Sequence, residues 1–143
     1  MRDYFCKAWQ LIDMVSNRML GAAGFLAHIF NNFLKWNVCI DVIATSEVSV
    51  SCTVSGKEKL EGLVQDLSKA CDVSVRKERA IVTVICDVEH SSAILASGFE
   101  ALADEGINVQ MISQGASKVN ISFIVNDDEA DRTVQILHQA YFG

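Results

Sequence analysis

Two carboxylates stand at the ends of a short stretch, DVIATSE, between residues 41 and 47. Asp41 ends one apolar run and Glu47 begins the next, so both acids fall at the margins of expected strands. We expect them to share a face and to meet one cation, because two nearby carboxylates repel each other when partly buried unless positive charge lies between them. The alternative is that both are ordinary solvated acids at strand ends.

A loop of small residues, MLGAAG (19–24), precedes a helix predicted from Phe25 to Trp36, where apolar residues recur at helical spacing. The first N–H groups of a helix have no partner within it, and the helix dipole is positive at that end. This loop therefore offers donors to a carboxylate, and its glycines allow close approach to the backbone. Acids and free amides together suit a small molecule that carries both charges.

These residues are embedded in a repeating order of elements. The predicted elements are strand 11–15, helix 25–36, strands 38–43 and 48–54, helix 57–71, strand 73–79, strand 80–86, helix 91–105, strands 107–112 and 119–125, and helix 127–141. Apolar residues of the first half, such as Leu26, Phe33 and Val42, fall on apolar residues of the second half at an offset of 69. The offset becomes 71 for the strand at 48–54, so two small domains are duplicated in tandem.

Each repeat has the order βαββαβ, which is the ferredoxin-like arrangement of the α+β class. The sequence predicts two such domains with antiparallel sheets, the second lacking its last strand. That sheet must leave an edge open, borrow a strand from MRDYFCKAWQ, or pair with another chain. We expect a divergent segment at 1–10, a first domain at 11–79 and a second at 80–143.

Composition narrows the classes of function. The net charge is −6 with basic residues scattered singly, which disfavours nucleic acid as a partner. The most apolar segment is shorter than the roughly 20 residues that span a bilayer, so no membrane partner is expected. His28, His90 and His138 show no spacing for a metal or for acid–base catalysis. The five cysteines, at positions 6, 39, 52, 71 and 86, form no CxxC pair and are predicted to be buried free thiols.

The stretches MLGAAGFL, NVCIDVIATSEVSVS and INVQMISQGASKVNIS closely resemble the tandem ACT domains at the C-terminus of aspartate kinases, especially the monofunctional lysine-inhibited type. The resemblance implies an amino-acid sensor that forms a homodimer through its ACT sheets and binds lysine at the interface. Lysine, with two ammonium groups, suits two acids better than threonine does. The family motif transfers these effector contacts: Met19, Ala22, Gly24, Phe25, Leu26, Cys39, Ile40, Asp41, Ser46 and Glu47.

In the second repeat Gln110, Gln114 and Asn120 replace the acid and hydroxyls, so the resemblance implies dimer pairing there, or else a degenerate effector site. No Gly-rich phosphate loop is present, so no catalytic residue is expected and the chain alone should not phosphorylate aspartate. ATP and magnesium would belong to a kinase catalytic domain acting in cis or in trans. The resemblance implies a cytoplasmic location in a bacterium and a plastid location in a plant or alga.

Three other interpretations stay open. The chain is a fragment of an active aspartate kinase, or it is a stand-alone regulatory subunit that works with a separate catalytic subunit. A ferredoxin-like RNA binder or metal chaperone ranks far lower, because basic stacking aromatics and a CxxC loop are both absent.

Overall fold

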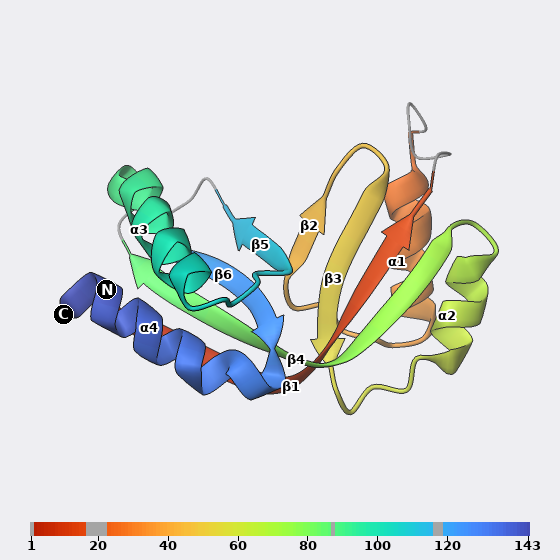
Figure 1. Ribbon diagram of the computed structural model, residues 1–143. Coiled ribbons are helices and arrows are strands. Elements are labelled where there is room, and N and C mark those ends of the chain that lie inside the picture. Colours follow the sequence, from red (N-terminus) through yellow and green to blue (C-terminus); the bar gives the residue numbers. More distant parts are fainter. Residues whose placement is uncertain (1, 17–22, 87, 116–118) are drawn as a thin grey trace. The chain divides into compact units, whose positions relative to one another are not determined.

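The computed structural model describes residues 2–16, 23–86, 88–115 and 119–143, with only the backbone described at 2–7, 88 and 119. The chain divides into two compact units. The first unit is Trp9–Lys77, and the second unit combines Met1–Ala8 with Glu78–Gly143. In each unit two helices cover one face of the strands (Figure 1).

The first unit has the strand order β2-β3-β1-β4, with antiparallel pairing of β3 to both of its neighbours. Its elements are β1 (Arg2–Val15), α1 (Phe25–Lys35), β2 (Ile43–Thr45), β3 (Ser49–Ser55), α2 (Glu61–Ser68) and β4 (Asp72–Cys86). The strands β1 and β4 each contribute one end to the first unit and the other end to the second. Strand β2 is the edge strand of the first unit.

The second unit has the order β1-β4-β6-β5, with β6 antiparallel to β4 and to β5. Its remaining elements are η2 (Val88–His90), α3 (Ser91–Asp104), β5 (Met111–Gln114), β6 (Val119–Asn126), η3 (Asp127–Glu129) and α4 (Ala130–Phe142). The stretch 80–143 thus ends without a last strand, as expected from the sequence. Of the three alternatives for its sheet, the structure has the second: the N-terminal segment is the start of β1 and belongs to this unit.

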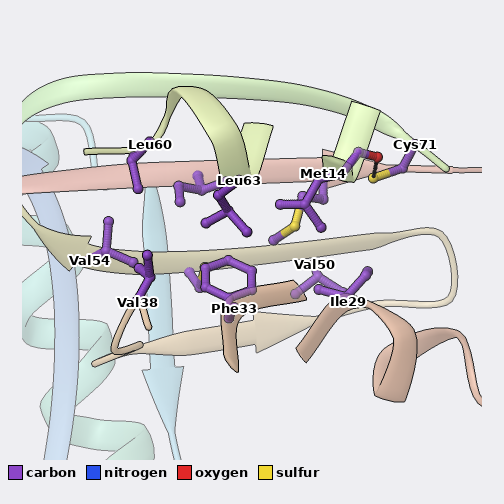
Figure 2. Close-up of a cluster of buried hydrophobic side chains, with 12 residues drawn as sticks. Met14, Ile29, Phe33, Val38, Val50, Val54, Leu60, Leu63 and Cys71 are labelled. Atoms are coloured by element: carbon purple, nitrogen blue, oxygen red, sulfur yellow. Dashed lines mark hydrogen bonds between the residues drawn. The ribbon is translucent and has the colours of Figure 1, made fainter. Parts of the chain in front are cut away.

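Each unit has its own hydrophobic core between helices and sheet. In the first unit Ile29 and Phe33 of α1 pack with Val50 of β3 and Leu63 of α2 (Figure 2). In the second unit Phe123 of β6 is fully buried, and its ring packs edge-to-face with that of Phe99 on α3, with 5.5 Å between the ring centroids. Both units therefore bury the apolar stripes that the sequence pattern indicated.

The predicted repeat is confirmed by the strand registers. In the first unit Ile43 lies opposite Cys52, and in the second Ile112 lies opposite Phe123. These pairs are related by the offsets 69 and 71 that the sequence showed. The helix ends repeat as well, because Asn37 follows α1 with φ 53° and Gly106 follows α3 with φ 72°. Both residues close their helix in the left-handed conformation of a C-terminal cap.

A surface network joins the end of α1 to α2. The carboxylate of Asp66 accepts hydrogen bonds from Nε1 of Trp36 at 2.7 Å and from Nζ of Lys35 at 2.8 Å. Lys69 adds a third contact at 3.3 Å. The ring of Trp36 lies against Gly62, where a Cβ atom would collide with it. These donors, Lys35 first and then Trp36, hold the pKa of Asp66 well below its usual range.

Acid is expected to weaken this network. The folded pKa of Asp66 lies below that of the unfolded chain, about 3.9. Its contribution to stability is therefore complete above that pH and is lost as pH falls below it. In urea unfolding, the difference in unfolding free energy between the natural chain and Asp66→Asn should shrink below about pH 4. Asp104→Asn, at an exposed acid, serves as the control and should show no such pH dependence. An effect of Asp66→Asn that does not change with pH would contradict the lowered pKa of Asp66.

Candidate functional site

The candidate site belongs to the first unit and begins at the N-terminal end of α1. Gly24 is the residue before the helix and has φ 86°, a conformation that favours glycine. No described side chain caps the first turn of α1. Phe25 is half-buried against the core and Leu26 is 41% exposed, so Leu26 is accessible beside the helix amides. Of the predicted contacts, Met19 and Ala22 lie outside the described residues.

The second part of the candidate site is the chain between α1 and β2. Cys39 and Asp41 are exposed, whereas Ile40 between them is half-buried against the core. The buried Thr53 of β3 holds this segment. Its carbonyl oxygen accepts from the N–H of Asp41 at 2.9 Å, and its own N–H donates to the carbonyl oxygen of Val42 at 2.9 Å. Its Oγ1 also accepts from the N–H of Val42 at 3.0 Å.

The third part is the turn between β2 and β3. The N–H of Ser46 donates to the carbonyl oxygen of Ser49 at 2.9 Å, and the two hydroxyl oxygens are 2.7 Å apart. Glu47 is exposed in this turn. The carbonyl oxygen of Val48 accepts from the N–H of Ser16 at 2.8 Å. The turn therefore lies beside the end of β1, where the described chain breaks off before residue 17.

The predicted contacts fall into two groups at opposite ends of β2. Ile29 of α1 lies near Val50, and Val38 lies near Val54, so the N-terminal end of α1 is on the side of the Ser46 turn (Figure 2). Gly24, Phe25, Leu26, Ser46 and Glu47 belong to this end, which we call the turn group. Cys39, Ile40 and Asp41 form the other group, which we call the strand-start group.

Within one chain, Asp41 and Glu47 lie too far apart along β2 to form the single acid pair that the sequence suggested. Asp41 is bonded to Thr53 and Ser46 to Ser49. These two partners are four residue steps apart on β3, which corresponds to about 13 Å. That separation exceeds the screening length of about 8–10 Å in physiological salt. Repulsion between the two carboxylates of one chain therefore does not require a cation between them. Within the described chain neither carboxylate makes an ion pair. Each acid is therefore available separately.

Two other sequence expectations need correction. Val48 was expected to begin the strand 48–54, but it lies in the turn before β3 begins and is 36% exposed. Cys39 was expected to be a buried thiol and is exposed, because the chain leaves α1 there without entering the sheet. Cys52 and Cys71 are buried as expected, and burial raises the pKa of Cys52 to about 12. The side chain of Cys6 lies outside the described residues.

Thr53→Val should loosen the segment that carries Asp41. The substitution removes the hydroxyl that accepts from Val42, and an amide left without its partner costs about 1–3 kcal/mol. Amide hydrogen exchange at Val42 should accelerate, and the unfolding free energy should fall by a similar amount. Thr83→Val is the control, because within the described residues the hydroxyl of Thr83 bonds only to that of Ser122, in the second unit. Unchanged exchange at Val42 would show that Thr53 does not hold the segment.

The second unit carries the counterpart of the strand-start group. The N–H of Gln110 donates to the carbonyl oxygen of Ile124 at 2.8 Å, which repeats the bond between Asp41 and Thr53. Its side chain is already engaged: Oε1 accepts from Nε of Arg79 at 2.7 Å, and Nε2 donates to Oδ1 of Asn126 at 2.7 Å. At this position the second unit thus has no acid, and the side-chain oxygen of Gln110 is already bonded to the guanidinium of Arg79.

Other site types find no support in the described chain. Its residues include no cluster of three or more His, Cys, Asp and Glu side chains able to hold a metal ion. None of its helices has the length and apolar character that crossing a membrane requires.

The comparisons with known proteins agree with this fold. A family model for the ACT domain matches residues 82–141. Aspartokinase 3, chloroplastic, from Arabidopsis thaliana is 48% identical over 141 residues, covering 92% of this chain and 25% of the relative. The chain thus spans about a quarter of the length of the curated relatives it matches.

Solved structures match over almost the whole chain. Escherichia coli aspartokinase III in complex with lysine and aspartate superposes with a TM-score of 0.82 at 31% identity, covering 100% of this chain and 33% of that one. A chain described as a C-terminal regulatory domain of aspartate kinase from Porphyromonas gingivalis has a TM-score of 0.83 at 28% identity, covering 99% and 97%. The fold and these matches define a tandem ACT-domain protein. The chain belongs to the C-terminal regulatory regions of the aspartokinase family.

Proposed function

We propose that this chain senses lysine and transmits its binding to an aspartokinase catalytic domain as feedback inhibition. The turn group offers the helix amides of α1 to the carboxylate of the ligand, and the exposed acids offer partners to its two ammonium groups. The E. coli relative was crystallised in complex with lysine, which supports the choice of ligand.

The observation that carries this proposal is the placement of the two groups at opposite ends of the edge strand β2. In a dimer with two-fold symmetry, any contact between two different parts occurs twice, with the partners exchanged. Two copies paired along antiparallel β2 strands bring the strand-start group of one chain beside the turn group of the other. Each such junction holds Asp41 of one protomer and the partner's Glu47, and it can hold one lysine with its four-carbon stem.

Pairing through β2 also gives the proposal its mechanism. A ligand can shift an equilibrium only by its differential affinity for the two states. Lysine bound between two protomers stabilises the arrangement of the paired first units in which the turn group and the strand-start group both contact it. A catalytic domain that is sensitive to this arrangement is thereby coupled to lysine binding. ATP and magnesium would act in the catalytic domain, which is joined in cis or recruited in trans. In a plant or alga the whole protein would be plastidial, as the Arabidopsis relatives are named chloroplastic.

Calorimetric titration of this chain with lysine, threonine, methionine and S-adenosylmethionine tests the proposal. We expect saturable heat with lysine, a stoichiometry of one per protomer, and none with threonine or methionine. Binding of threonine in preference to lysine would overturn the choice of ligand, and the absence of heat with every compound would overturn sensing. Copurification with a separate catalytic subunit would identify the chain as a stand-alone regulatory subunit. An in-frame kinase region upstream in the gene would instead identify it as part of an aspartate kinase chain.

A further inference from the structure

A cavity that the lysine proposal does not use lies in the first unit. It has a volume of about 590 Å³ and lies between residues 56–60, the start of α2 and the β4 end at Val75 and Lys77. This volume falls within the range of small-molecule sites, about 300–1,000 Å³. The contacts predicted for lysine do not line it.

Gln10 of β1 lines this cavity and is only 5% exposed. Its Nε2 donates to the carbonyl oxygens of Ser55 and Glu58, each at 3.1 Å. Both N–H groups of the amide are therefore used, which fixes its orientation. The carbonyl oxygen Oε1 has no hydrogen-bond partner among the described residues. A buried acceptor of this kind costs free energy unless a donor reaches it.

The cavity also meets the N-terminal end of α2. No side chain caps this helix, and the N–H groups of residues 61–63 have no partner in the described chain. Lys57 and Lys59 line the cavity beside them and form no ion pair with a described residue. Glu58 and Glu61 also line the cavity, so its charged side chains are three lysines, with Lys77 as the third, and two acids. The surplus of positive charge and the free helix amides together favour an anion.

We propose that this cavity binds a small carboxylate that also carries an amine or hydroxyl donor, such as an acidic amino acid. The carboxylate lies against the amides of α2 and the ammonium groups of Lys57 and Lys59. The donor of the ligand reaches Oε1 of Gln10. The site is separate from the proposed lysine site and does not depend on it, because no residue of the turn group or the strand-start group contributes.

Titration of the ¹⁵N-labelled chain with L-glutamate, followed by amide chemical shifts, tests the proposal. Saturable shifts are expected at residues 57–63 and at the side-chain amide of Gln10. Glutarate keeps both carboxylates but lacks the amine, so it should bind at least about tenfold more weakly, which is 1.4 kcal/mol. Equal affinity of glutarate or inorganic phosphate would overturn the role of Gln10, and unsaturated shifts with every compound would overturn the site.

Variants on the surface lysines complete the test without touching the buried glutamine. The double variant Lys57→Gln, Lys59→Gln should bind L-glutamate about tenfold or more weakly than the natural chain, because hydrogen bonds to a charged group contribute about 1.5–3 kcal/mol. The control is Lys69→Gln, at the other end of α2, which should bind as the natural chain does. Equal weakening by both variants would contradict the proposal. Asp41→Asn should leave L-glutamate binding intact, so failure of the lysine site is distinguishable.

Discussion

Phe33→Ala should lower the unfolding free energy of the first unit by about 3–5 kcal/mol, the usual cost of replacing a buried phenylalanine. Phe33 is 2% exposed and packs in the core of the first unit between α1 and the sheet. The cost has two parts, namely the loss of apolar burial and the cavity left behind. A loss of this size is a large fraction of the roughly 5–15 kcal/mol that stabilises a typical domain.

The neighbouring residue supplies a matched control. Leu34 lies on the same helix but is 77% exposed, so Leu34→Ala should change the unfolding free energy by less than about 0.5 kcal/mol. Urea unfolding monitored by circular dichroism gives both values. Similar losses for the two variants would mean that the position of α1 on the sheet is wrong. The candidate lysine contacts at both ends of α1 would then be misplaced too.

Asp41→Asn and Glu47→Gln should each weaken the binding of lysine at least tenfold and up to about a hundredfold, because a hydrogen bond to a charged group contributes about 1.5–3 kcal/mol. Both acids are exposed and form no ion pair within the described chain, so neither substitution should unfold the protein. Calorimetric titration with lysine measures the loss. Asp104→Asn, an exposed acid of α3, should leave lysine binding unchanged.

Mixed dimers distinguish a site between protomers from a site within one. If each site combines Asp41 of one protomer with the partner's Glu47, then a dimer of one Asp41→Asn chain and one Glu47→Gln chain keeps one intact site. Such a dimer, purified with two different tags, should bind one lysine per dimer with the natural affinity. A mixed dimer as weak as either variant alone would place both acids of a site in the same chain.

The sequence predicted the fold well where periodicity was undisturbed. Helix α1 was expected at 25–36 and is Phe25–Lys35, and the repeat offsets reproduce the registers of both edge strands. The prediction failed where a local backbone feature interrupts the pattern. The apolar alternation at 38–43 suggested a strand, but β2 begins only at Ile43, because Asp41 and Val42 both bond to Thr53.

Long-range contacts explain the remaining differences. A helix was expected from 57, but α2 begins at Glu61, because Gln10 binds the carbonyl oxygens of Ser55 and Glu58 and holds the loop before it. Two strands were expected, at 73–79 and at 80–86, but β4 is one continuous strand in which Glu78 has the irregular φ of 57°. Single-sequence periodicity carries no signal for either effect.

The identity of the candidate lysine contacts was accessible from the motif, but their arrangement was not. The spacing of Asp41 and Glu47 suggested neighbours on one face, and only the pairing of β2 with β3 shows that they lie at opposite ends of a strand. Gln10 was not expected to have a role, because a lone glutamine in an apolar strand carries no motif. Its burial and its hydrogen bonds single it out.

Amide chemical shifts of the ¹⁵N-labelled chain during titration with lysine show whether both groups of the first unit bind the ligand. We expect saturable shifts at both groups of the first unit, from Gly24 to Leu26 and from Cys39 to Glu47, with Gln110 of the second unit unaffected. Shifts centred on Gln110, or shifts confined to one end of β2 in the dimer, would contradict this expectation.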